Sequence, residues 1–141
     1  MLRRAGLMLA CASVALASVA ARAQAEIDSV PAFEAARTFL ATLDAGRYAE
    51  GWNDAAPALR ESMTRVQWET GLVAARNPLG VTIVRKIREA SCAHGTGADT
   101  GTEICVIRYE TRFENRPVAT EIAMPVRGRD GTWRVASYVL R

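Results

Sequence analysis

Gln67-Trp-Glu-Thr-Gly-Leu-Val-Ala-Ala-Arg-Asn-Pro-Leu-Gly80 is the stretch where this chain changes from a helical half to a strand half. Thr64 can accept a hydrogen bond from the backbone N–H of Gln67 while the Gln67 side chain reaches back, so a capping box starts a helix here. Pro78 disfavours helical dihedral angles in the residue before it. We therefore expect the helix to stop at Asn77 and Gly80 to turn the chain into a sheet.

The residues before this stretch predict two further helices. The first begins near Ser29 or Val30 and ends before Gly46, which suits a left-handed C-cap. Its apolar residues fall three and four positions apart, as on one helical face: Phe33, Ala36, Leu40 and Leu43. The second is expected from about Arg47 to Leu59, with Pro57 weakening its last turn.

Four strands are expected after Gly80. Their ranges are Val81 to about Cys92, Glu103 to Glu114, Val118 to Val126, and Thr132 to Leu140. The second strand alternates apolar and charged residues, which is typical of a sheet with one face in water. Short links favour antiparallel neighbours. The sequence thus predicts an α+β fold in which N-terminal helices pack on a curved four-stranded antiparallel sheet.

The last strand carries apolar side chains on both predicted faces. Trp133, Val135 and Val139 alternate on one face, and Ala136, Tyr138 and Leu140 on the other. Both faces would then need cover. A homodimer through the second face of the sheet is the resulting hypothesis.

Residues 1–25 have the layout of a secretory signal peptide. Arg3 and Arg4 precede an apolar run, and cleavage is expected near Ala23 or Ala25. A lipid-modified Cys11 is the less favoured alternative, because the apolar run continues past that cysteine. The run is shorter than the ~20 residues that span a bilayer, so no stable membrane insertion is expected after signal removal. The product is predicted to be a single periplasmic or secreted domain, residues 26–141.

Charge argues against a nucleic-acid partner. The chain has 18 Lys and Arg against 15 Asp and Glu, and three of the arginines, Arg3, Arg4 and Arg22, lie in the predicted signal. The domain that remains is formally neutral. It therefore lacks the basic excess that binding to phosphate backbones requires, and we interpret the excess as part of the targeting segment.

Short motifs spread over residues 26–141 resemble the family catalogued as domain of unknown function 4019. They are Leu43-Asp44-Ala45-Gly46-x-Tyr48-x-x-x-Trp52, Gln67-Trp68, Arg76-x-Pro78-Leu79-Gly80, Arg85, Glu121 and Gly131-x-Trp133-Arg134-Val135-x-x-Tyr138. The resemblance implies no established activity. The order of elements is also similar to the cone-shaped folds of the nuclear transport factor 2 and ketosteroid isomerase type, which is an analogy of layout alone.

Cys92 and Cys105 bracket the long link between the first two strands. In an exported chain they predict a disulfide, which would contribute roughly 3 kcal/mol. His94 beside them is expected to be a solvated loop residue, because a metal site or a general base would need companions. The glycine-rich link joins two strands, so it does not match a phosphate-binding loop. No metal, cofactor or catalytic residue is assigned.

Arg85 is the most informative single residue. In a regular strand it shares a face with Val81, Ile83 and Ile87, which would place a guanidinium in the apolar side of the sheet. A buried charge needs a partner. We expect an ion pair with Glu121 or Asp54, with Arg76 as a second cation nearby, or a bulge that turns Arg85 outward. The alternative is a pocket that receives a carboxylate.

The function predicted from these patterns is a non-enzymatic module that binds an unknown small molecule or protein. The alternative is a small cavity enzyme of isomerase or hydratase type, which would need converging carboxylates. Candidates for lining a pocket are Arg76, Arg85, Trp52, Trp68, Tyr109, Glu121, Trp133 and Tyr138. For the aromatic members, a place in the core is the favoured interpretation.

Overall fold

The computed structural model describes residues 26–96 and 101–141; the predicted signal peptide and residues 97–100 of the glycine-rich link lie outside these ranges. Within these two ranges, four α-helices and one 3-10 helix precede four strands: α1 Val30–Asp44, α2 Tyr48–Asp54, α3 Pro57–Ser62, α4 Arg65–Arg76, η1 Asn77–Leu79, β1 Thr82–His94, β2 Glu103–Phe113, β3 Arg116–Arg127 and β4 Trp133–Leu140. The strands form one antiparallel sheet in the order β1-β2-β3-β4. This confirms the predicted α+β class.

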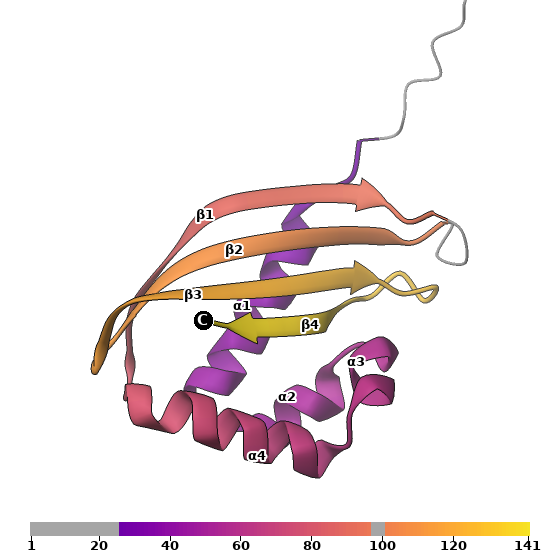
Figure 1. Cartoon of the computed structure of the whole chain (residues 1–141). Helices are drawn as coiled ribbons and strands as arrows, with labels where there is room; N and C mark the ends of the chain where they lie inside the picture. The colour runs from indigo at the N-terminus through magenta and orange to yellow at the C-terminus, as the bar shows by residue number, and fades with distance from the viewer. Residues whose placement is uncertain (1–25, 97–100) are drawn as a thin grey trace, which may run out of the picture.

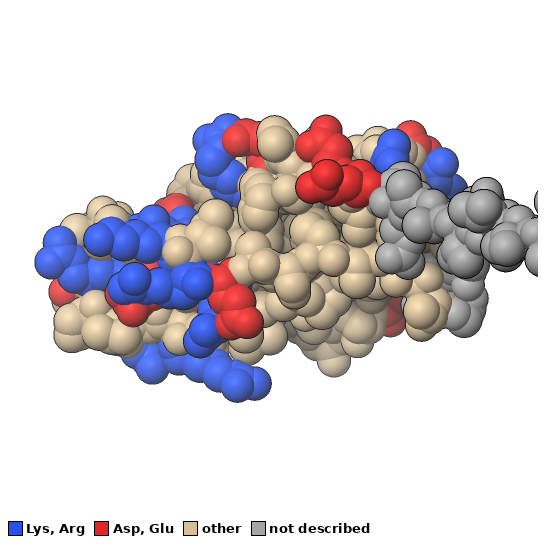
Figure 2. All heavy atoms as spheres, turned by 90° about the horizontal axis from the view of Figure 1, so that it is seen from above, with Lys and Arg blue, Asp and Glu red and all other residues tan. Residues whose placement is uncertain are grey.

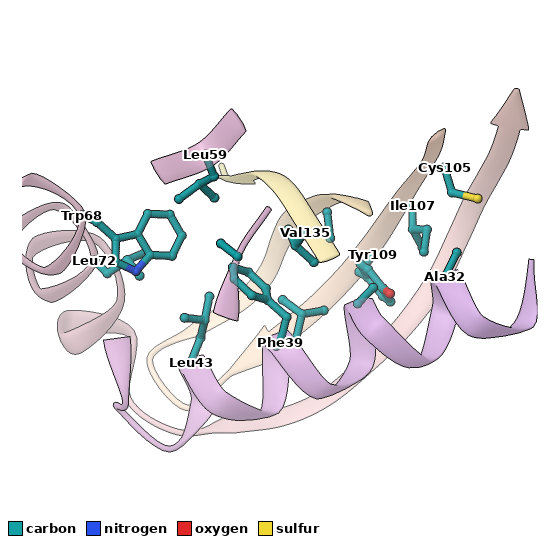
Figure 3. Close-up of a cluster of buried hydrophobic side chains, with 14 residues drawn as sticks. Ala32, Phe39, Leu43, Leu59, Trp68, Leu72, Cys105, Ile107, Tyr109 and Val135 are labelled. Carbon is teal, nitrogen blue, oxygen red and sulfur yellow. The ribbon is translucent and has the colours of Figure 1, made fainter. Parts of the chain in front are cut away.

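The helix α1 crosses the concave face of the curved sheet. The helices α2, α3 and α4 lie together beyond the C-terminal end of α1 (Figure 1). The buried residues of α1 recur at helical spacing and face the sheet. Figure 3 shows side chains from α1, the other helices and the strands pointing toward one another in the core. That core includes Ala32, Phe39, Leu43, Leu59, Trp68, Leu72, Cys105, Ile107, Tyr109 and Val135. Among the described residues, no helix combines the length and hydropathy needed to cross a bilayer.

The expected helix from Arg47 to Leu59 is two helices, because Ala55 and Ala56 have extended dihedral angles. Pro57 begins α3 instead of weakening the end of α2, which corrects the prediction. A proline disfavours the helical conformation of its predecessor and fits the first helical turn, where its missing N–H costs nothing. The interruption is used structurally, since the Ala56 N–H donates to the Val135 oxygen of β4 at 2.9 Å.

The stretch from Gln67 to Gly80 begins as the sequence predicts, but its backbone after α4 differs from the prediction. Thr64 and Gln67 form the predicted capping box. The α-helix α4 ends at Arg76 with Asn77 as its C-cap, so the predicted stop is confirmed. The expected reason is wrong, because Asn77 keeps helical angles and the chain continues as the 3-10 helix η1 before it turns. The turn then takes place at Gly80, whose φ of 73° a residue with a Cβ rarely adopts.

A β-bulge changes which residues of β1 face the core. Thr82 pairs with Phe113 and Val84 with Arg112, so Ile83 is an extra residue in the register. As a result Thr82 and Arg85 both reach inward, whereas Ile83 is 50% exposed. The prediction that Ile83 and Arg85 share a face is therefore wrong. A bulge does occur, but it directs Arg85 inward and not outward.

A second bulge changes the assignment of β4 side chains to faces from which the homodimer hypothesis was drawn. Met124 pairs with Ser137 and Pro125 with Val135, which leaves Ala136 as the extra residue of β4. Tyr138 therefore lies on the same face as Val135, with its ring against Phe39 of α1 at 6.0 Å. The predicted split of these side chains between two faces is wrong. A dimer is no longer needed to cover Tyr138.

Cys92 and Cys105 face each other across β1 and β2 and form the predicted disulfide. Their Cα atoms are 4.1 Å apart, and 13 positions of sequence separate them. The bridge ties the two strands together at the base of the glycine-rich link. His94 is the last residue of β1 and belongs to the strand instead of the loop in which it was expected.

Replacing both cysteines by serine should lower the free energy of unfolding by roughly 3 kcal/mol, because the denatured chain loses a cross-link that closes a short loop. Urea unfolding of the double variant and of the wild type, both without reductant, measures the difference. An unchanged urea midpoint, or an intact mass that reduction and alkylation leave unaltered, would contradict this role of the bridge.

Candidate functional site

Four charged side chains from four separate elements meet at the end of the core. Asp44 is the last residue of α1, Arg76 the last residue of α4, Arg85 lies on β1, and Glu121 lies on β3. We call these four residues the charged cluster. Their exposed side-chain fractions are 26% for Asp44, 4% for Arg76, 15% for Arg85 and 0% for Glu121. The cluster is thus buried at Glu121 and reaches solvent at Asp44.

Glu121 accepts four hydrogen bonds on the inner face of the sheet. Its Oε1 accepts from Arg76 Nη1 at 2.7 Å and from the Tyr138 hydroxyl at 2.6 Å. Its Oε2 accepts from Arg85 Nε at 2.7 Å and from the Thr111 hydroxyl at 2.5 Å. An ionised carboxylate has about four acceptor sites, so this one is satisfied within the fold.

Asp44 likewise accepts four hydrogen bonds, at the outer end of the cluster. Arg85 donates to it with both terminal nitrogens at 2.8 Å, a bidentate pair that fits the planar guanidinium. Arg76 Nη2 and the hydroxyl of Thr82 also donate to Asp44 Oδ1. Both arginines therefore bridge the two carboxylates, and the four formal charges sum to zero.

Aromatic rings surround the inner guanidinium. The Arg76 Cζ lies 5.4 Å from the ring centre of Phe113 and 5.9 Å from that of Tyr138, within the range of cation–π attraction. The Tyr138 hydroxyl accepts from Arg76 at 2.6 Å while it donates to Glu121. Arg76 is thereby held both by hydrogen bonds and by two nearby aromatic rings.

Burial and charge act in opposite directions on the ionisable groups. Burial alone would raise the pKa of Glu121, but hydrogen bonds and charge from Arg85, with further hydrogen bonds from Thr111 and Tyr138, bring it below its usual range. For Asp44, burial is likewise outweighed by the hydrogen bonds and charge of Arg85, and its pKa is also lowered. Burial, followed by the charge of Glu121, raises the pKa of Tyr138.

These directions limit the chemistry of the cluster. A general acid or base works best when its pKa is near the working pH and its proton can reach a substrate. Both carboxylates stay ionised at neutral pH, their acceptor positions are occupied, and the Tyr138 proton is committed to Glu121. The arrangement stabilises a structure and offers no free proton donor or acceptor.

The structure brings half of the predicted site residues together. Arg76, Arg85, Glu121 and Tyr138 meet in or at the cluster. Trp68 packs with Phe39 and Tyr138 at ring-centre distances of 6.0 and 6.3 Å, so it is a core residue. Tyr109 is also buried in the core, and Trp52 and Trp133 pack against its margin.

Asp44 is the member of the cluster that was not among the site residues predicted from the sequence. The expected alternative partner of Arg85, Asp54, does not contact it; Asp54 lines a separate groove. One signal could have found Asp44. A carboxylate in the last turn of a helix faces the negative end of the helix dipole, so an external cation should hold it there.

A groove lies on another side of the fold, between α1, α2, α3 and the start of β4. Its volume is about 590 Å³. Its lining includes the buried core residues Phe39 and Val135, the partly buried Trp133, and the exposed charged residues Asp54 and Arg60. We call it the α1–β4 groove. Neither Asp54 nor Arg60 forms an ion pair within residues 26–96 and 101–141, so both charges are available there.

A larger open hollow, of about 920 Å³, lies between residues 26–33 and the end of β1. Its wall on the strand is made of small side chains from Ala90 to Ala93. This hollow borders residues outside the described ranges and is not part of the candidate site. In the part of the chain that the structure describes, no three His, Cys, Asp or Glu side chains gather as a metal site.

Replacing Arg85 by methionine should lower the free energy of unfolding by about 3–5 kcal/mol, because it leaves Glu121 and Asp44 without their main cation. The matched control is Arg88→Met, which removes an exposed arginine of the same strand and should leave stability unchanged. Urea unfolding of both variants measures the contrast. Equal urea midpoints for Arg85→Met and the wild type would refute the structural role of the cluster.

The lowered carboxylate pKa values also predict an acid-dependent stability. Reference pKa values are 4.5 for Glu and 3.8 for Asp, so the contribution of the cluster should be complete above about pH 5. It should be lost as the pH falls through the lower folded-state values. Glu121→Gln should be less stable at pH 7 and should lose less between pH 7 and pH 3. Urea midpoints across that range test this; parallel curves for the two proteins would contradict it.

Comparison with known families supports the resemblance seen in the sequence. The family described as Protein of unknown function (DUF4019) matches residues 35–138, which include every residue of the charged cluster. Searches of the curated proteins and of the solved structures give no match for this chain. The likeness to nuclear transport factor 2 therefore stays an analogy of layout. The chain belongs to the DUF4019 family, whose function is unknown.

Proposed function

We propose that this protein is an exported binding module without catalytic activity, and that it takes a small ligand into the α1–β4 groove. The observation that carries the proposal is that Asp54 and Arg60, which form no ion pair within the described residues, both line a groove that the partly buried Trp133 also lines. A volume of about 590 Å³ is in the range of small-molecule sites.

Export is supported by two independent features. The first 25 residues have the charged start, apolar run and small-residue end of a secretory signal. The disulfide between Cys92 and Cys105 is a bond that persists in oxidising compartments such as the periplasm.

The charged cluster supports binding over catalysis. An isomerase or hydratase of cone type would need a carboxylate base and an acid that converge on its substrate. In this fold the most buried carboxylate, Glu121, is already paired with two arginines and two hydroxyls. Its pKa is lowered, whereas a catalytic carboxyl commonly needs a raised one.

The charges of Asp54 and Arg60 suggest the ligand's chemistry. Arg60 suits a carboxylate and Asp54 suits an amine, while the partly buried Trp133 offers apolar contact. A free amino acid or a short peptide combines these features. The groove is built on three helices and a strand, so it is preformed and the ligand pays little ordering entropy.

Thr38 offers a way to test the groove, because it is an exposed residue of α1 on its wall. Free amino acids and di- and tripeptides would be titrated into the protein and followed by backbone-amide NMR. For the tightest binder, Thr38→Trp should raise the dissociation constant at least about tenfold by filling the groove.

The matched control is Thr70→Trp, which adds the same side chain at an exposed position of α4 outside the groove lining. It should leave the dissociation constant unchanged. If no member of the panel shifts the amide signals of the groove, or if both variants bind like the wild type, the proposal is wrong.

A further inference from the structure

The neutral charge of the domain conceals an uneven distribution. Seen from above, blue side chains gather at the end of the molecule where β1 begins and β2 turns into β3 (Figure 2). We call this end the basic tip. We define it by three cations and four aliphatic residues: Lys86, Arg112, Arg116, Val81, Ile83, Val84 and Val118.

The cations of the basic tip are not neutralised by ion pairs. Lys86, Arg112 and Arg116 form none within residues 26–96 and 101–141. Lys86 and Arg112 line a shallow hollow of about 400 Å³ together with Glu110. Glu110 is paired with Arg88 at 2.6 Å and is also the cross-strand neighbour of Lys86, so two cations share this one carboxylate.

The aliphatic side chains of the tip are exposed among these cations. The exposed fractions are 63% for Val81, 50% for Ile83, 40% for Val84 and 66% for Val118. Val84 pairs with Arg112, and Val118 lies in the register irregularity on the other side of that arginine. Single exposed aliphatic residues are ordinary, but a group around unpaired cations marks an interaction surface.

We propose that the basic tip docks on the surface of a membrane that contains anionic phospholipid. Its cations would bind lipid phosphates, and its aliphatic side chains would enter the interface between head groups and acyl chains. The inference is independent of the α1–β4 groove, which lies elsewhere on the fold.

The shape and charge of the tip favour this partner over two others. A protruding end of strands and turns can rest on a flat bilayer. The outer edge of β1 is free, but the bulge at Ile83 and the charge of Lys86 disfavour regular pairing with an added peptide strand. A second copy of the chain would bring like charges together, which opposes association. Because the domain is formally neutral, the attraction comes from the tip alone and should fall steeply with salt.

The test is co-sedimentation of the purified protein with vesicles at low ionic strength. Vesicles of phosphatidylcholine with phosphatidylglycerol should bind it, and vesicles of phosphatidylcholine alone should not. The triple variant Lys86→Gln, Arg112→Gln and Arg116→Gln should lower the partition coefficient by about 100-fold, since each cation contributes about a factor of five.

The control triple variant, Arg37→Gln, Arg65→Gln and Arg129→Gln, removes the same total charge from other surfaces. It should bind vesicles like the wild type. Val118→Ser should weaken vesicle binding while leaving its dependence on salt unchanged, because it removes only apolar contact. Circular dichroism checks that each variant is folded.

Three outcomes would overturn the proposal. Equal losses in the two triple variants would mean that total charge, and not the tip, attracts the membrane. Complete release by millimolar inorganic phosphate at constant ionic strength would indicate a site for a free anion. Binding to polyglutamate without any binding to anionic vesicles would indicate an acidic protein partner.

Discussion

The pairing of Glu121 with two arginines is the constraint on which the rest of this structure depends. Glu121 lies on β3, an inner strand of the sheet, and its side chain is fully buried. A carboxylate there without partners would cost several kcal/mol. Its partners come from the end of α4 and from β1, so the charge is tolerated only when the helical half and the strand half of the chain are assembled together.

The same pairing accounts for the path of the chain from Arg76 to Arg85, where the helical half of the fold is followed by the strand half. Arg76 ends α4, and the 3-10 helix η1 and Gly80 then bring the chain into β1 so that Arg85 returns to the same carboxylates. The bulge at Ile83 completes the alignment, because it places Thr82 and Arg85 on one face. With its polar atoms satisfied, the cluster closes this end of the core.

Local signals in the sequence predicted much of the fold. The capping box at Thr64, the alternation in β2 and the turn at Gly80 each depend on neighbours within a few residues. The errors occurred where a long-range partner decides the local geometry. Ala56 is extended and bonded to β4, Asn77 keeps helical angles while its side chain accepts a hydrogen bond from Tyr48, and Ala136 is an extra residue that moves Tyr138 into the core.

By itself, the sequence determined the α+β class, the disulfide and the need of Arg85 for a buried partner, because patterning and desolvation act on any chain with these residues. It also predicted export, from a segment outside the described residues. Only the tertiary structure decided that Asp44 is the second carboxylate, since it lies 32 and 41 positions from the two arginines. Such contacts carry no local pattern, and they form only when the packing of α1, α4 and the sheet sets the distances between their ends.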